Sequence, residues 1–174
     1  MAITAVATPA TLGWADFVVV PTQIVDPNDG SLVDAVTRFN FNIPDLAPRT
    51  VNGQVAMADP NVITITPNSR VFSGVAQTAA LLSHEQFHYD VGFVVARSLG
   101  RHLAALRARD VATLRVLFAD AARLHIDVRV RLLQNRYDID TRHGTNAHFQ
   151  KIWKDRMRHC LAHARADHLG GFWL

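Results

Sequence analysis

Two histidines and a glutamate stand close together in the run His84-Glu85-Gln86-Phe87-His88. On a helix, four residues of separation place His84 and His88 on one face, one turn apart, so both imidazoles can bind one metal ion. Zinc is expected, because catalytic zinc sites use imidazole nitrogens and keep a position open for water. The metal lowers the pKa of that water, and Glu85 is placed to accept its proton as general base. The motif therefore predicts a zinc-dependent metallopeptidase with one catalytic ion.

A catalytic zinc site needs a third protein ligand. Glu85 is the only glutamate in the chain, so sites with a downstream glutamate ligand are excluded. The extended pattern with Gly and His three and six residues after His88 is excluded as well, because Val91 and Val94 stand there. The third ligand must be a later His, Asp or Cys, and the candidates are His102, His125, His143, His148, His159, His163, His168, Asp138, Asp140 and Cys160.

The segment Tyr137–Gly144 is the favoured source of that ligand. We expect it to be a loop after a helix long enough to return the chain toward His84, and His143 within it is the favoured ligand. Asp138 and Asp140 are its rivals, and as neighbours they are also expected to orient a ligating imidazole by hydrogen bonding. Tyr137 is expected either to donate a hydrogen bond to the oxyanion that develops in catalysis, or to pack at a helix end. His159 and His163 are also four apart, but no glutamate stands between them.

The first 70 residues have the pattern of strands and turns. Alternation over Asp34–Ile43 predicts a half-buried strand, and Asn52-Gly53 predicts a hairpin turn. Asn61–Thr66 is rich in β-branched residues and precedes the motif, as does the edge strand that binds peptide substrates in zincins. Further strand and turn signals lie at Trp14–Pro21 and Asn28–Ser31.

The pattern becomes helical near Val75, and one helix is expected from there to about Arg109. A second is expected from an Asp110 N-cap to Asn135, and a third from an Asn146 N-cap to His168. Strands first and helices later indicate an α+β fold, with a small antiparallel or mixed sheet packed on the active-site helix and two further long helices. The chain is expected to be a single domain, strand-rich over 1–70 and helical over 71–174.

Four segments of the chain resemble a bacterial family of zincin-like predicted metallopeptidases that is catalogued as domain of unknown function 922. The run Leu81–Asp90 resembles its segment LL-x-HEQ-x-H-[FY]-D, and Leu12–Phe17 resembles its LTWADF opening. Ser69-Arg70-Val71 is similar to the short segment before its active helix. The later signature YD-x-x-T-x-HG…Q-x-x-W is matched by Tyr137, Asp138, Thr141, His143, Gly144, Gln150 and Trp153.

This resemblance covers most of the chain. It implies a zincin-like fold, peptidase activity and zinc bound by His84, His88 and the histidine of the HG motif, His143. The chain departs from the family at Phe93, where other members often carry an acidic residue. Family members are also commonly exported.

Charge is distributed unevenly, and it favours one alternative function. Residues 1–96 hold three Arg and eight acidic residues, whereas residues 97–174 hold fifteen Lys or Arg and seven Asp. A basic helical half would suit a non-catalytic zinc-binding domain that recognises an acidic partner. Nucleic-acid binding is disfavoured, because aromatic residues are not interleaved with the arginines as base-stacking platforms. The expected partner is a peptide or protein substrate.

Composition is that of a globular protein with a substantial core, since 49% of the residues are hydrophobic. The single cysteine, Cys160, excludes an intrachain disulfide. No apolar run reaches the roughly 20 residues of a membrane-spanning helix. The N-terminus has no basic region followed by an apolar stretch, so no secretory signal is visible. We therefore expect a protein that is cytoplasmic as synthesised or exported by a route without such a signal.

Overall fold

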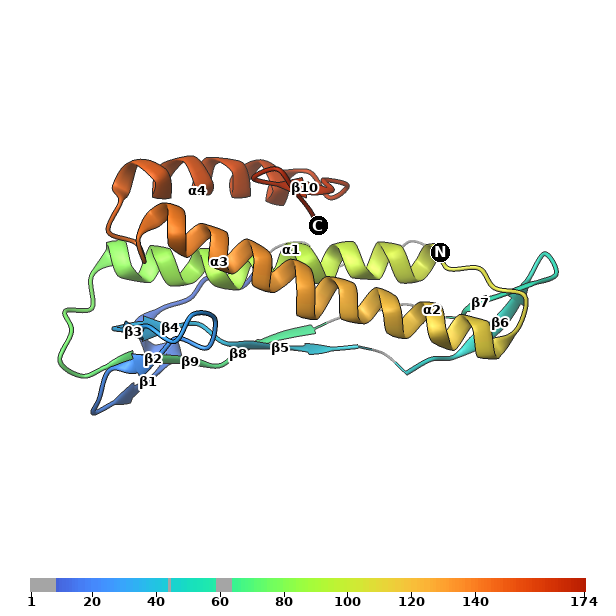
Figure 1. Ribbon diagram of the computed structural model, residues 1–174, viewed down its shortest axis with the longest axis horizontal. Helices are drawn as coiled ribbons and strands as arrows, with labels where there is room; N and C mark the ends of the chain where they lie inside the picture. The colour runs from blue at the N-terminus through green and yellow to red at the C-terminus, as the bar shows by residue number, and fades with distance from the viewer. Residues whose placement is uncertain (1–8, 44, 59–63) are drawn as a thin grey trace.

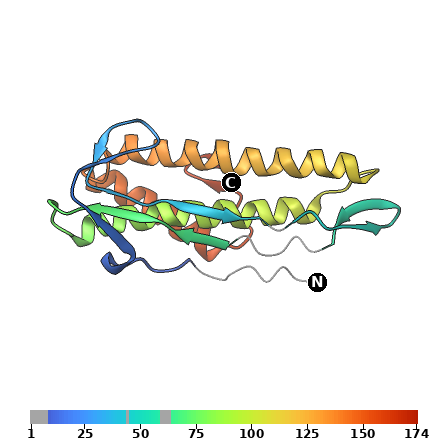
Figure 2. The ribbon, with the colours of Figure 1, turned by 90° about the horizontal axis from the view of Figure 1, so that it is seen from below.

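The computed structural model describes residues 9–43, 45–58 and 64–174. Strands dominate the first part of the chain and helices the second, which confirms the α+β class (Figure 1). The strands that precede helix α1 (Ala79–Ala105) form one layer on one side of it, and helix α4 (Ala147–Ala162) lies on its other side (Figure 1). Figure 2, seen from below, shows these strands in front of α1 and running along much of its length.

The largest sheet among the described residues has three strands in the order β1-β9-β4. Strand β1 (Phe17–Val20) pairs in parallel with β9 (Ser69–Phe72), and β4 (Ala35–Val36) pairs antiparallel with the other side of β9. Strand β4 therefore stands at an edge of this sheet. The other pairs of this layer are antiparallel: β2 (Ile24–Val25) with β3 (Leu32–Val33), β5 (Phe39–Asn42) with β8 (Thr64–Pro67), and β6 (Pro48–Val51) with β7 (Gln54–Met57).

Most of the predicted strands and turns are present, with shifted bounds. A 3-10 turn, η1 (Trp14–Asp16), precedes β1, and Asp34–Ile43 is two strands, β4 and β5, instead of one. Asn52 and Gly53 both have positive φ, 50° and 77°, and connect β6 to β7 as the hairpin turn expected there. The predicted strand Asn61–Thr66 is represented by β8, and its residues 61–63 lie outside the described residues.

Helix α1 begins four residues later than predicted, at an N-cap where the Thr78 hydroxyl accepts a hydrogen bond from the Leu81 amide. Nearly every residue from His84 to Leu103 is buried, so α1 is enclosed on all sides. Gly92 permits this, because a Cβ at that position would lie 2.6 Å from the Phe39 ring of β5. Apolar side chains of α1 enter all three hydrophobic clusters, represented by Val94, Leu99 and Tyr89.

The second helical region differs from the prediction. Asp110 caps it as expected, but the helix continues through α2 (Val111–Arg123), a π-helical stretch η2 (Leu124–Arg129) and α3 (Val130–Thr141) without interruption. The prediction that the helix ends near Asn135 and that Tyr137–Gly144 is all loop was wrong. Tyr137 and Asp138 are therefore helical residues on α3.

Helix α4 (Ala147–Ala162) packs against α1 and α3 and is capped by Asn146, as predicted. It ends six residues before the expected end at His168. His168 instead lies in β10 (His168–Leu169), which pairs with β11 (Phe172–Trp173) in a small C-terminal hairpin. The region after residue 70 is consequently not wholly helical. Among the described residues, no helix is long and apolar enough to span a membrane.

Candidate metal centre

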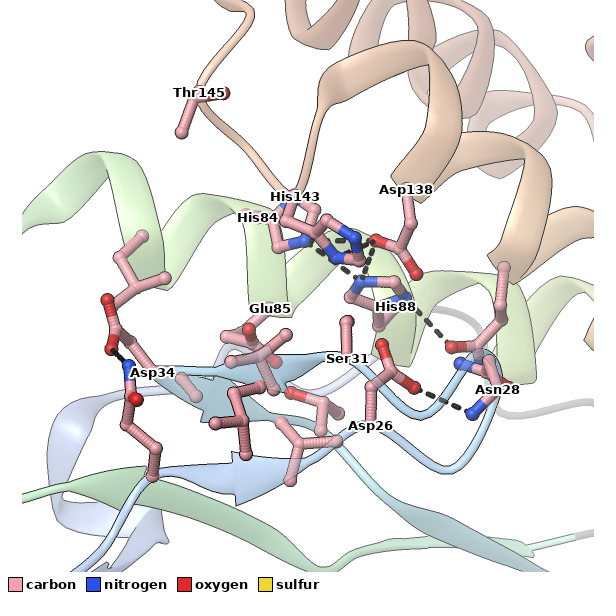
Figure 3. A pocket seen from close by; sticks show the side chains of 18 residues that line it. Asp26, Asn28, Ser31, Asp34, His84, Glu85, His88, Asp138, His143 and Thr145 are labelled. Atoms are coloured by element: carbon pink, nitrogen blue, oxygen red, sulfur yellow. Dashed lines mark hydrogen bonds and ion pairs between the residues drawn. The ribbon is translucent and has the colours of Figure 1, made fainter.

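The motif His84–His88 lies in the first turns of α1, and this part of the helix is in the interior of the protein. His84, Glu85 and His88 are all buried, with 4%, 2% and 7% of their surfaces exposed. Polar side chains in such a position require partners, because burial without hydrogen bonds or a counter-ion is costly. The partners come from α3, which crosses α1 beside these residues (Figure 3).

Three side-chain atoms converge at this crossing. The two imidazole Nε2 atoms of His84 and His88 lie 3.1 Å apart. Asp138 Oδ1 lies 3.2 Å from His84 Nε2 and 3.1 Å from His88 Nε2. Ligands around a tetrahedral zinc ion, with bonds of about 2.0 Å, are separated by roughly 3.3 Å. The triangle thus has the dimensions of one face of a zinc coordination sphere, and two imidazoles with a carboxylate form a suitable donor set.

Gln134 orients one of the imidazoles. It lies one helical turn before Asp138 on α3, and its Oε1 is 2.8 Å from His88 Nδ1. An amide oxygen can only accept, so Nδ1 carries the proton and donates it to Gln134. In the neutral imidazole, His88 Nε2 is then unprotonated and can direct its lone pair at the triangle. Partners of this kind set the tautomer of metal-binding histidines.

The carboxylates around His88 favour one positive charge within this cluster. Burial lowers the pKa of His84 to about 4, and the nearby charge of His88 contributes. Burial also acts on His88, but the Asp138, Glu85 and Asp26 carboxylates outweigh it and raise the pKa of His88 to about 9. Although burial opposes it, the same imidazoles hold the pKa of Asp138 below its usual range. A bound cation would satisfy this environment in place of the proton on His88.

Glu85 lies beside the triangle on the same cavity wall. Burial raises the pKa of its carboxyl, while the charge of His88 and the neighbouring Thr37 oppose that rise. Its Oε2 has no hydrogen-bond partner among the described residues. A buried carboxyl that is free to receive a proton is the expected state of a general base.

A cavity of about 230 Å³ gives access to these groups. Its walls come from α1, from α3 and from the segment between β2 and Thr37, so the strands β3 and β4 form one side (Figure 3). His84, Glu85, His88, Asp138 and His143 all line it. The triangle can therefore be reached by a small molecule or an extended chain.

His143 lies at this cavity, in a different position from the triangle. It follows the end of α3 in a left-handed stretch where Arg142, His143 and Gly144 all have positive φ. Gly144 is needed there, because its φ is +82° and a Cβ would lie 3.1 Å from the His84 ring. His143 Nδ1 is 3.9 Å from Asp138 Oδ1, and its Nε2 is 3.5 Å from Asp29 Oδ2. The residue that completes the compact triangle is Asp138, one of the two predicted rivals of His143.

Asp140 and Tyr137 occupy other surroundings. The Asp140 carboxylate pairs with Arg136 and accepts a hydrogen bond from the Trp153 indole, so it orients no imidazole of the triangle. Tyr137 is fully buried, and its ring stacks on Phe87 and on His84 at centroid distances of 3.8 and 4.8 Å. It is not among the residues that line the cavity, so the structure gives it a packing position, and its predicted catalytic role remains a prediction.

The remaining ligand candidates also lie outside the set that lines the cavity. They contact each other or their chain neighbours: His102 with His125, His159 with His163, His148 with Phe149, His168 with Asp167, and Cys160 with the His168 carbonyl.

Sequence reasoning missed Gln134, Asp26 and Thr37. For Gln134 a signal existed, because it stands four residues before Asp138 and shares its face on a continuous helix. The prediction that the helix ends near Asn135 concealed it. Asp26 and Thr37 line the cavity because the β2–β5 segment packs beside α1, and no local sequence pattern indicates that packing.

Comparisons with known proteins identify no relative. No family model, no curated protein sequence and no solved structure matches the chain.

Proposed function

We propose that the protein is a zinc-dependent metallopeptidase of the zincin type that hydrolyses peptide bonds. His84, His88 and Asp138 hold the ion, and Glu85 is the general base. The observation that carries this proposal is the 3.1–3.2 Å triangle of donor atoms with the buried Glu85 carboxyl on the same cavity wall.

The residues fit a zinc ion by their chemistry. Imidazole and carboxylate donors suit zinc, and Asp138 Oδ2 is buried without a hydrogen-bond partner in the described part of the chain. Two His and one carboxylate also bind iron(II) in oxygenases. Glu85 favours zinc and hydrolysis, because hydrolysis requires a proton acceptor beside the ion.

Each protein group has a defined task in this proposal. An ion held by His84, His88 and Asp138 would acidify a water molecule and polarise the substrate carbonyl. Glu85 accepts a proton and later donates it to the leaving amine, which its raised pKa assists. Gln134 holds the His88 tautomer that binds metal. Strand β4 stands at an edge of the described three-stranded sheet and lines the cavity, so an extended peptide can pair with it.

The test compares Glu85→Gln with the wild type at equal metal content. We expect the variant to retain its metal and to lose hydrolysis of an unfolded protein substrate by about 10²–10⁴-fold, the contribution of a general base. Glu85→Asp is the matched variant, because it keeps the charge and withdraws the carboxyl by one methylene. Metal analysis of the purified protein distinguishes zinc from iron.

Equal hydrolysis by wild type and Glu85→Gln would show that Glu85 is not the base. A wild type that binds zinc but hydrolyses nothing would support the non-catalytic zinc-binding domain instead.

A further inference from the structure

A second group of potential ligands lies next to the triangle and shares Asp138 with it. Asp26, Asp138 and His143 each offer a ligand atom, and these atoms lie within 4.8 Å of one another. Figure 3 shows the three side chains converging on one side of the cavity, with Asp26 opposite Asp138. We propose that this group is a second divalent-cation site, weaker than the first and bridged to it by the Asp138 carboxylate.

Asp26 is built into a fixed position. Its side chain is buried at 6% exposure, and its Oδ1 accepts a hydrogen bond from the Asn28 amide at 2.7 Å. Its backbone amide donates to the Ser31 carbonyl, and its carbonyl accepts from the Gly30 amide. The turn between β2 and β3 therefore holds the carboxyl at the cavity wall instead of letting it rotate into solvent.

Asp138 has the capacity to bridge two ions. Both of its carboxylate oxygens are buried without a hydrogen-bond partner among the described residues, and only Oδ1 lies beside the two imidazoles of the triangle, so Oδ2 is left for a second ion. A buried carboxylate oxygen without a donor is costly unless a cation or a donor satisfies it. Carboxylates that bridge metal ions about 3.5–4 Å apart are a recurrent arrangement in two-metal hydrolases.

His143 makes the group a metal site in preference to a pocket for an ammonium group. An imidazole nitrogen is a strong ligand for zinc and related ions, whereas carboxylates alone would suit an ammonium group equally well. The left-handed backbone at Arg142 and His143 holds the ring over the cavity, 3.9 Å from Asp138 Oδ1. His143 remains 37% exposed, so an ion can enter from solvent.

The charge of the cavity also leaves room for a second cation. Asp26, Glu85 and Asp138 are three buried carboxyl groups on its walls. One divalent ion bound by neutral histidines leaves a net negative charge when all three are ionised. His143 Nδ1 lies 3.9 Å from Asp138 Oδ1, farther than the 3.1–3.2 Å between donor atoms of the triangle, and His143 is partly exposed, so this second ion is the weaker one.

The test is a zinc titration of metal-free protein by calorimetry, with bound metal counted after equilibrium dialysis. We expect two ions per wild-type chain, with distinct affinities. Asp26→Asn and His143→Ala should each bind one ion, at the wild-type affinity of the tighter site. Retention of that tight ion shows that each variant is folded. Hydrolysis is not measured, so this result is independent of the proposed activity.

His159→Ala is the matched control, because it removes an exposed imidazole from a helical pair elsewhere. It should still bind two ions. The proposal is overturned if the wild type binds one ion, or if His159→Ala loses the weaker one. It is also overturned if His143→Ala loses the tight ion, which would make His143 a ligand of the first site, or if both site variants keep two ions.

Discussion

Two pairs of histidines in this protein have the same spacing and different surroundings. His84 and His88 lie four residues apart on α1, and His159 and His163 lie four apart at the end of α4. Their ring centroids are similarly close, 4.7 Å in the first pair and 4.2 Å in the second. Helical spacing alone therefore brings imidazoles together in both places.

The two histidine pairs differ in burial and in whether a carboxylate lies beside them. The first pair is enclosed by α3, and Asp138 and Gln134 provide a carboxylate and a tautomer-setting acceptor. The second pair is exposed, and His163 Nδ1 lies 2.8 Å from the His159 carbonyl. Within the described residues neither member of this second pair forms an ion pair with a carboxylate. A pair of imidazoles becomes a candidate metal centre where tertiary structure adds donors and removes water.

The largest expected difference is in metal binding. His84→Ala should weaken zinc binding by more than the 10–100-fold that loss of an outer partner costs, because a direct ligand is removed. His159→Ala should leave the tight ion unchanged. Competition with a chromophoric chelator measures both affinities. Equal losses in the two variants would contradict the distinction between the pairs.

One carboxyl group lies near each histidine pair, and ionisation of the two should have opposite effects on the free energy of unfolding. Burial raises the pKa of Asp90 to about 6 from 3.8, although Gln86 donates a hydrogen bond to it. Its ionisation therefore destabilises the fold as pH rises from about 4 to 6, by up to about 3 kcal/mol. In metal-free protein, Asp90→Asn should raise the free energy of unfolding at pH 7 and have little effect at pH 4. Urea unfolding at both pH values measures this.

Asp155, one turn before His159, is the control for that experiment. Hydrogen bonding and charge from Lys151, followed by the charge of Arg158, hold the pKa of this exposed carboxyl below its usual range. Asp155→Asn should therefore fail to stabilise the protein at pH 7. Stabilisation by Asp155→Asn and not by Asp90→Asn would show that burial is not the cause.

Loss of the Gln134 side chain should reduce zinc affinity less than loss of a ligand, but more than loss of a neighbouring side chain outside the site. Gln134→Ala removes the acceptor that fixes His88, so zinc affinity should fall by about 10–100-fold. Asn135→Ala, the adjacent change on the same helix, should leave it unaltered. The same chelator competition compares the two, and an unchanged affinity in Gln134→Ala would remove Gln134 from the site.

The smallest effect, on the stability of the fold, is expected from a change at Tyr137. Its hydroxyl is buried without a partner among the described residues, so Tyr137→Phe should be neutral or stabilise by about 1 kcal/mol. Tyr89→Phe is the matched change, and it should be neutral or destabilising, because the Tyr89 hydroxyl donates to the Ile65 carbonyl. Thermal unfolding measures both. A Tyr137→Phe variant that folds normally but hydrolyses peptides far more slowly would restore the predicted oxyanion role.

Sequence patterns predicted the helix caps and the hairpin turn correctly, but they predicted the end of the second helix wrongly. The helix caps Asp110 and Asn146 and the turn at Asn52-Gly53 are set by interactions within a few residues, and all three are present. The end of the second helix was misplaced because Tyr137 on α3 packs against Phe87 on α1, a tertiary contact that favours helix beyond Asn135. Helix propensity is a weak guide where tertiary contacts of this kind act.

The sequence by itself determined that His84, Glu85 and His88 share one helix, and that no other glutamate competes as a ligand. It left the third ligand open between His143 and two aspartates. Only the tertiary structure decided which side chain meets the two imidazoles, because that depends on where α3 crosses α1. The crossing places Asp138 against His84 and His88, and turns Asp140 toward Arg136 and Trp153. Two residues one half-turn apart on a helix point in different directions, and only packing determines which of them faces the site.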